Sequence, residues 1–211
     1  MTRDNKMAFD YLDAARTLQA LAQTGLAYCK DAFDRERFTA IRSIALHMLA
    51  HLAKASPQKV AEVFLPETGY STPKIDVRAV ILRNDEMLFV QERSDGHWTL
   101  PGGWTDVGLS PAENVEKEVL EECGLEVRVT KLLACYDKRK HDHPLEVLHV
   151  YKLFFLCELT GGQMAPGLET SDVAFFPEKH LPSLSVHRVT RGQVLRMFEH
   201  GRDRALPTDF N

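Results

Sequence analysis

The stretch that most constrains the fold is LPGGWTDVGLSPAENVEKEVLEECGL, residues 100–125. Its centre predicts a helix with well-marked ends. Ser110 can serve as the N-cap, and Pro111 suits the first helical position, where a missing N–H costs nothing. Glu113, three residues after the cap, can close a capping box, and Gly124 can end the helix in a left-handed conformation. We therefore expect a glycine loop, a capped helix and a closing turn.

Two faces of this predicted helix differ in character. At about 100° per residue, apolar side chains form one stripe that suits packing on a sheet, and these are Ala112, Val115, Val119 and Cys123. Glu118, Glu121 and Glu122 fall on a neighbouring arc, and we expect Lys117 to point to another side. Carboxylates this close repel one another, and a hard divalent cation would reverse that repulsion.

A solvated acidic face is the alternative, and it is what a bare ExxEE pattern most often indicates. The Gly102-Gly103 loop before the helix favours the metal site instead. It follows an apolar, aromatic strand end, and glycine, carboxylates and terminal glycine at these spacings form a longer pattern than a run of charges.

Composition and charge narrow the class of protein. Of 211 residues, 44% are hydrophobic and 27% charged, as in ordinary soluble globular proteins. A net charge of -4 argues against nonspecific nucleic-acid binding as the main activity. The start MTRDNKMAFD has no apolar signal region, and no apolar run approaches the roughly 20 residues of a membrane span. Because no run is long enough to span a membrane, we expect no membrane partner. Because the four cysteines are scattered without a CxxC pair, we expect a cytoplasmic protein with reduced thiols.

The spacing of apolar residues changes once along the chain. Over about residues 8–65 they recur at helical spacing, with Asp34 as the expected N-cap of the second of three helices. A linker rich in proline, glycine and small polar residues follows, and after it the apolar residues alternate. We therefore predict a small all-α domain over residues 1–68 and an α/β domain over residues 69–211.

Within the α/β domain, the pattern predicts a β-hairpin with its turn at Asn84-Asp85. After the central helix we expect three more strands and a final helix, over residues 127–136, 147–159, 172–176 and 188–200. Arg188 and Arg191, on that last helix, are expected to be surface residues.

The 100–125 stretch resembles the Nudix box, the signature of hydrolases acting on a nucleoside diphosphate linked to a moiety X. The matching positions are Gly103, Glu118, Glu121, Glu122, Gly124 and Leu125. Leu109 and Lys117 depart from the pattern, standing where a glutamate and an arginine are expected. In the family those two side chains chiefly support the loop. The stretches LAQTGLAYCKDAFDRERFTAIRSIA, DKRKHDHP and GLETSDVAFFP are similar to a bacterial subgroup that has a helical extension and includes CDP-choline pyrophosphatases.

The resemblance implies a Nudix α/β/α sandwich with a mixed sheet, behind a helical domain that contributes to a homodimer. It also implies a Mg2+ (or Mn2+) site. Glu118 and Glu122 would be the core ligands, and the Gly103 carbonyl can add a backbone ligand because glycine lets the main chain approach closely. Glu121 would bind a second ion or act as the general base. The later acidic residue Glu169 is the other candidate for the base.

Several residues near the predicted site are candidates to bind substrate. The guanidinium fork of Arg93 suits phosphate oxygens, and Gly102 belongs to the loop before the helix. The alternative for Arg93 is a strand-end arginine in solvent. A polar loop offers further contacts to phosphate or X, and its candidates are Asp137, Lys138, His141 and His143. The alternative there is a charged loop with no ligand role.

The predicted function is metal-dependent cleavage of a nucleoside diphosphate-X between its two phosphates, giving a nucleoside monophosphate and X-phosphate. CDP-choline and ADP-ribose are the leading substrates. Two other classes stay open. One is a nucleotide-sensing Nudix domain without turnover, motivated by Leu109 and Lys117. The other is an RNA-end hydrolase with a basic groove at residues 138–141, which the overall acidity disfavours.

Overall fold

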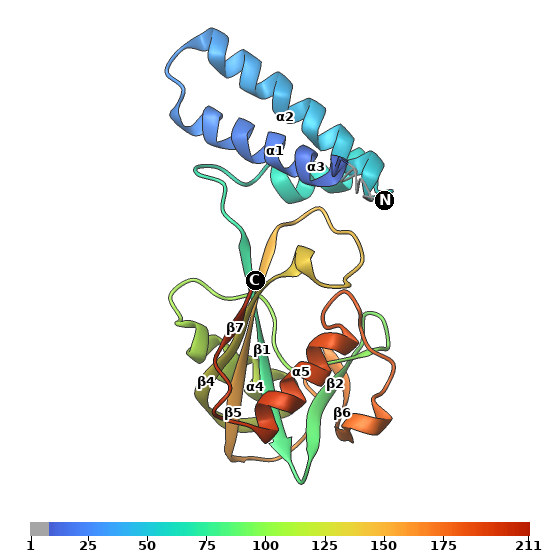
Figure 1. Cartoon of the computed structure of the whole chain (residues 1–211). Coiled ribbons are helices and arrows are strands. Elements are labelled where there is room, and N and C mark those ends of the chain that lie inside the picture. The colour runs from blue at the N-terminus through green and yellow to red at the C-terminus, as the bar shows by residue number, and fades with distance from the viewer. Residues whose placement is uncertain (1–8) are drawn as a thin grey trace, which may run out of the picture. The chain divides into compact units, whose positions relative to one another are not determined.

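A computed structural model describes residues 9–211 of the chain (Figure 1). Residues 1–8, which the sequence assigns to the helical domain, lie outside the described residues. The chain divides into two compact units. One comprises the chain up to Pro73 together with Leu145–His149, and the other comprises Lys74–Pro144 and Val150–Asn211. None of the described helices combines the length and hydropathy that a membrane span requires.

The first unit contains three helices, α1 (Tyr11–Tyr28), α2 (Ala32–Leu52) and α3 (Pro57–Phe64). The N-cap of α2 is Asp31, whose carboxylate accepts the N–H of Phe33 at 2.8 Å and of Asp34 at 3.1 Å. The prediction that Asp34 caps this helix is therefore wrong. Asp34 lies in the first turn, where a carboxylate also suits the helix dipole.

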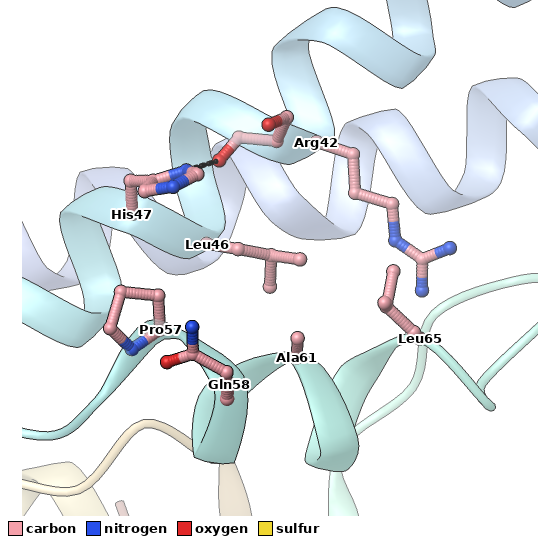
Figure 2. Close-up of a pocket in the computed structure, with 8 residues that line it drawn as sticks. Arg42, Leu46, His47, Pro57, Gln58, Ala61 and Leu65 are labelled. Carbon is pink, nitrogen blue, oxygen red and sulfur yellow. Dashed lines mark hydrogen bonds between the residues drawn. The ribbon is translucent and has the colours of Figure 1, made fainter.

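A cavity of about 290 Å³ lies between α2 and α3 (Figure 2). Four of its eight lining residues are apolar, Leu46, Pro57, Ala61 and Leu65, and Arg42 is among the others. Nη2 of Arg42 donates to the carbonyls of Phe64 and Glu67 at 2.5 Å and 3.0 Å. Arg42 therefore satisfies carbonyls at the C-terminal end of α3, a structural role.

The second unit is built on a mixed sheet of seven strands in the order β3-β2-β1-β5-β4-β7, with β6 paired to β2. β1 pairs in parallel with β5 and β4 in parallel with β7, whereas the other pairs are antiparallel. The bounds are β1 Lys74–Arg83, β2 Glu86–Glu92, β3 Trp98–Thr99, β4 Leu125–Asp137, β5 Val150–Gly162, β6 Thr170–Pro177 and β7 Asp209–Phe210.

Helices cover both faces of this sheet (Figure 1). α4 (Pro111–Cys123) packs Val115 and Val119 against one face, and α5 (Arg191–Arg202) packs Val194 and Met197 against the other. The predicted α/β/α sandwich is confirmed. The remaining regular segments are two short 3-10 helices, η1 (Lys138–Lys140) and η2 (Glu178–His180).

The last helix begins later than expected. Thr190 is its N-cap and forms a capping box with Gln193, so Arg188 lies in the preceding loop. The helix continues to Arg202, two residues past the predicted end at residue 200. The predicted start at Arg188 is wrong because the capping residue, rather than the apolar pattern, sets the boundary.

One edge of β1 changes partner halfway along, and this opens the space in which the candidate site lies. β1 pairs with β2 only at Leu82↔Met87 and Arg83↔Glu86. Nearer the start of β1, the glycine loop takes the place of β2. The N–H of Ala79 donates to Pro101 at 2.8 Å, and that of Val77 donates to Gly103 at 2.9 Å. The strand ends of β1 and β2 therefore separate, with the glycine loop held between them.

Candidate active site

The helix that carries the acidic residues forms as its local signals predict. Ser110 is the N-cap of α4 and forms a capping box with Glu113, and Gly124 ends the helix with φ of 67°. Val119 and Cys123 are fully buried against the sheet. The position of α4 is thus fixed by its caps and its apolar stripe, which leaves its acidic arc beside the glycine loop.

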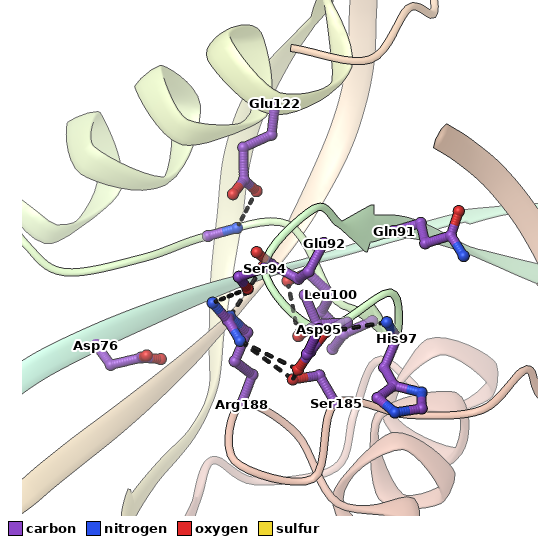
Figure 3. Close-up of polar contacts among 12 residues, drawn as sticks. Asp76, Gln91, Glu92, Ser94, Asp95, His97, Leu100, Glu122, Ser185 and Arg188 are labelled. Atoms are coloured by element: carbon purple, nitrogen blue, oxygen red, sulfur yellow. Dashed lines mark hydrogen bonds and ion pairs between the residues drawn. The ribbon is translucent and has the colours of Figure 1, made fainter. Parts of the chain in front are cut away.

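The backbone of Gly102 holds the Glu122 carboxylate. The Gly102 N–H donates a 2.8 Å hydrogen bond to Oε2 of Glu122, a side chain that is buried (Figure 3). Gly102 has φ of +134°, and a Cβ added there would lie 2.1 Å from the Val77 carbonyl oxygen. Only glycine allows the loop to contact β1 and α4 together.

Two carboxylates of the acidic arc are desolvated. Burial raises the pKa of Glu122 to about 7, against the opposing effects of Arg78 and the Gly102 N–H. Burial also raises the pKa of Glu118, whose Oε2 would lie 3.2 Å from a Cβ added at Gly103. Burial disfavours the charged form of both carboxylates, and a cation bound beside them would favour that form. The pair therefore fits a hard divalent cation.

Glu121 is exposed and already paired. Nζ of Lys117 lies 2.9 Å from its Oε2 and 3.1 Å from Oδ2 of Asp106. The prediction that Lys117 points to another side of the helix is wrong, because residues four apart on a helix are neighbours. Within residues 9–211, no three His, Cys, Asp or Glu side chains are grouped to hold a metal. Glu121 would have to release Lys117 to join Glu118 and Glu122.

The loop before α4 is braced although Leu109 stands at the expected glutamate position. The buried side chain of Asn114 accepts the N–H of Asp106 at 2.7 Å and donates to the carbonyls of Ser110 at 3.0 Å and Leu109 at 3.3 Å. Lys117 contacts the same loop through Asp106. The sequence gives no local sign of the role of Asn114, since an asparagine in a helix usually faces solvent.

A buried ion triad lies on β1 and β5. Arg78 donates to both carboxylate oxygens of Asp76, at 2.9 Å and 2.8 Å, and Lys152 donates to Oδ1 of Asp76 at 2.6 Å. Burial opposes the charge of Asp76, but Arg78 and Lys152 hold its pKa down at about 2. Arg78 also donates to the Leu100 carbonyl at 3.0 Å, and its charge lowers the pKa of Glu122. Arg78 thus supplies fixed positive charge next to the acidic pair, a role that the sequence analysis missed.

A second network joins the end of β2 to the loop before α5 (Figure 3). Nε of Arg188 lies 2.9 Å from Oε1 of Glu92, a carboxylate only 4% exposed. Ser185 donates to Oδ2 of Asp95 at 2.7 Å. The expectation that Arg188 is a surface residue holds in part, since its side chain is 32% exposed, but its guanidinium pairs with a buried acid.

Arg93 and Glu169 meet through their backbones. The N–H of Arg93 donates to the carbonyl of Glu169 at 3.0 Å, and both side chains are exposed. The Glu169 loop also caps α4, since the Gly167 N–H and the Thr170 hydroxyl donate to the Glu122 carbonyl at 3.2 Å and 2.9 Å. The structure therefore brings Arg93 and Glu169 to the end of the helix that carries Glu122.

The two histidines of the polar loop after β4 are held in place by neighbours. The ring of His141 lies 4.2 Å from that of Tyr136, centroid to centroid. Nδ1 of His143 lies 2.7 Å from the Val186 carbonyl oxygen. Burial lowers the pKa of His141 and lowers that of His143 to about 4. At neutral pH both rings are therefore uncharged.

The other two residues of that loop lie at its start. Asp137 is the N-cap of η1 and forms a 2.7 Å ion pair with Arg139. Lys138 is buried, and its positive charge adds to the burial that lowers the pKa of Lys152 in the triad. The predicted substrate residues thus lie in three places. Gly102 contacts Glu122, Arg93 contacts Glu169, and the loop of Lys138 lies beside the triad.

Two family models match the chain. One, described as a UDP-X-like, N-terminal oligomerisation domain, matches residues 10–64. The other, described as the NUDIX domain, matches residues 72–198.

Relatives match over nearly the whole length or over the second unit. YjhB of Bacillus subtilis (strain 168), provisionally assigned as an ADP-ribose pyrophosphatase, is 41% identical over 206 residues, which are 98% of this chain and 99% of the relative. The ADP-ribose pyrophosphatase of Methanocaldococcus jannaschii is 29% identical over 119 residues, which are 55% of this chain and 69% of the relative.

Solved structures show the same similarity. An ADP-ribose pyrophosphatase from Streptococcus suis 89-1591 has 43% sequence identity and a TM-score of 0.61, covering 66% of this chain and 100% of that chain. A UDP-X diphosphatase has 34% identity and a TM-score of 0.63, covering 96% of this chain and 98% of that chain.

Proposed function

The chain belongs to the Nudix hydrolase family, and on that premise we propose that it hydrolyses the pyrophosphate bond of a nucleoside diphosphate-X. The products would be a nucleoside monophosphate and X-phosphate. ADP-ribose is the leading substrate, because several relatives carry that activity in their names. CDP-choline and UDP-linked compounds are the other members of the class to test. One observation carries the proposal: Glu118 and Glu122 are desolvated beside the glycine loop.

We propose that Glu118 and Glu122 hold Mg2+ or Mn2+, with the Gly103 carbonyl as a further ligand. When bound, the ion would neutralise charge on the phosphate oxygens. The chain's own part is to prepare the carboxylates before any ion arrives: the Gly102 N–H holds Glu122, and the nearby charge of Arg78 favours the ionised form of both Glu118 and Glu122. Preorganised ligands of this kind raise affinity because less freedom is lost on binding.

The substrate would be bound by Arg93 and by the loop of Asp137, Lys138, His141 and His143. An arginine fork suits a diphosphate, whereas uncharged histidines suit hydrogen bonds to X or to the nucleoside. For the general base we propose Glu169 or Glu121. Glu169 has the advantage of a loop fixed to the end of α4, while Glu121 is paired with Lys117.

The test is a panel of ADP-ribose, CDP-choline and UDP-linked sugars, assayed with magnesium and manganese, with the products identified by mass. Release of a nucleoside monophosphate from one compound supports the proposal. Tight ADP-ribose binding without any product would favour the nucleotide sensor instead. The bracing of the loop by Asn114 and Lys117 favours the hydrolase, because it compensates for Leu109.

An RNA-end hydrolase is the weaker alternative. The groove proposed for it, residues 138–141, contains His141, whose pKa is lowered by burial, and the whole chain carries a net charge of -4. Reversing the charges of Lys138 and Lys140 would impair RNA hydrolysis and spare a small substrate if that reading were right.

We further propose a domain division at residue 68, a homodimer formed through α1 and α2, and action in the reducing cytoplasm. The first helices expose apolar side chains, with Leu21 60% and Ile44 59% exposed. A groove of about 450 Å³ between them is lined almost entirely by apolar atoms. Such a surface is typical of an interface, and the matched family model describes an oligomerisation domain. All four cysteines are free, which supports a reducing compartment.

A further inference from the structure

The guanidinium of Arg188 contacts Glu92 at the end of β2, Ser94 and Asp95 in the turn after it, and Ser185 in its own loop. Its Nε pairs with Oε1 of Glu92 at 2.9 Å. Its Nη1 donates to Ser185 at 3.2 Å and lies 3.5 Å from Oδ2 of Asp95. Its Nη2 donates to Ser94 at 3.2 Å (Figure 3). The fork thereby joins two segments that lie more than ninety residues apart, residues 92–95 and residues 185–188.

The strand end that Arg188 holds carries one side of the proposed site. Arg93 follows Glu92 directly, and its N–H donates to the Glu169 carbonyl at 3.0 Å. On the other side of Glu92, the carbonyl of Gln91 accepts the Ser171 hydroxyl at 3.2 Å. A shift of Glu92 would therefore move Arg93, whereas the Glu169 loop keeps its own anchor at the Glu122 carbonyl.

Glu92 depends on its partner because it is buried. A buried carboxylate that loses its counter-ion is strongly unfavourable, so the segment around it would rearrange to reach solvent. Burial raises the pKa of Glu92, and the negative charges of Asp95 and Glu169 raise it further. Arg188 offsets this negative charge directly, through its contacts with Glu92 at 2.9 Å and Asp95 at 3.5 Å.

We propose that Arg188 is a positioning residue, which acts through Glu92 to hold Arg93 toward the diphosphate of the substrate. The inference rests on the proposed function and deepens it. Arg188 need not touch the substrate, since its four contacts, to Glu92, Ser94, Asp95 and Ser185, already hold its guanidinium to the protein. Its effect is expected on the substrate KM through Arg93, whereas Glu118 and Glu122 keep their affinity for the ion.

Kinetics with ADP-ribose and magnesium, or with whichever nucleoside diphosphate-X the panel identifies, test the coupling. Arg188→Met should raise KM about tenfold and change kcat less than about threefold, as should Arg93→Met. The double variant should be no worse than Arg93→Met within about twofold, because coupled residues are non-additive. A hundredfold rise in KM for the double variant would overturn the inference. Arg191→Met, an exposed arginine three residues later, is the matched control and should keep the wild-type KM.

Amide exchange followed by NMR gives a readout that does not need turnover. In Arg188→Met the Arg93 amide should exchange at least about tenfold faster than in the wild type, while Arg191→Met leaves it unchanged. Mn2+ affinity, measured by calorimetry, should stay within about twofold in both variants. An unchanged Arg93 amide in Arg188→Met overturns the inference, whatever the activity.

A second variant covers the case in which Arg188→Met does not fold. Arg188→Lys keeps the charge beside Glu92 but lacks the fork, so its Arg93 amide and KM should change in the same direction by about threefold. Wild-type values for both would overturn the inference. If the wild type cleaves no compound of the panel, the proposed function fails, and amide exchange alone then decides whether Arg188 holds Arg93 in place.

Discussion

Gly102 and Glu122 are joined by a 2.8 Å hydrogen bond from backbone to carboxylate, across 20 residues of sequence. This bond ties the glycine loop to the acidic helix and aims the carboxylate before any ion or substrate binds. The same loop is hydrogen-bonded to β1, so the sheet, the loop and α4 hold the acidic pair together.

Gly102→Ala should destabilise the protein and abolish activity. The added Cβ would lie 2.1 Å from the Val77 carbonyl oxygen at a φ that favours glycine, so we expect a loss of at least about 2 kcal/mol. Urea denaturation measures this. Gly192→Ala is the control, because a Cβ there meets open space within a helix. Equal stability of Gly102→Ala and the wild type would contradict the geometry.

The stability of the metal-free protein should fall as pH rises. The folded-state pKa of Glu122 is about 7, above the roughly 4.3 of an unfolded glutamate. A raised folded pKa means stabilisation that is present below pH ~4.3 and lost as pH rises through ~7, by up to about 3 kcal/mol. Denaturation in EDTA at several pH values between 5 and 8 measures this slope.

Glu122→Gln removes that titration and serves as the control for it. The variant should show a shallower decline with pH than the wild type, and Mg2+ should stabilise the wild type more at pH 8 than at pH 5. Parallel pH profiles of the two proteins would show that Glu122 titrates normally.

Asn114→Ala should loosen the loop before α4. The substitution leaves the N–H of Asp106 and two carbonyls without their buried partner, which costs about 1–3 kcal/mol. Amide exchange at residues 106–110 should accelerate, and activity should fall. Glu116→Ala, on the same helix, is a comparison that breaks a single contact to the Val129 N–H. A loop with unchanged exchange in Asn114→Ala would show that Lys117 alone braces it.

Leu21→Glu should convert the dimer into a monomer. A charge placed on the exposed apolar face of α1 would be desolvated in the proposed interface. Light scattering coupled to size exclusion measures the mass. Gln58→Glu, an exposed polar position on α3 with the same change in charge, should stay dimeric. A wild type that is monomeric at micromolar concentration would rule out the interface.

The sequence predicts the parts of this molecule whose signals are local. Ser110, Glu113 and Gly124 specify α4 within a single stretch, and the turn at Asn84-Asp85 is formed by two residues with positive φ. The pairing of Lys117 with Glu121 was also readable, since residues four apart on a helix meet. The capping box of Thr190 and Gln193 likewise marks where α5 begins.

What the sequence does not predict depends on the tertiary fold. Glu92 and Arg188 are far apart in the chain, and only the packing of the loop before α5 against β2 brings them together. The charge of Arg78 beside Glu122 requires β1 to lie next to the glycine loop. Charged residues within a strand carry no local mark of burial, because burial is decided by what packs on each face.

The central claim is that Glu122 belongs to the metal site of a nucleoside diphosphate-X hydrolase. The most direct measurement is magnesium-dependent turnover of ADP-ribose, or of the best compound in the panel, by the wild type and by Glu122→Gln, with folding checked by circular dichroism. We predict that the folded variant loses at least about a hundredfold in kcat, because an interaction with the developing charge on phosphate is removed. Full activity in a folded Glu122→Gln would contradict the assignment.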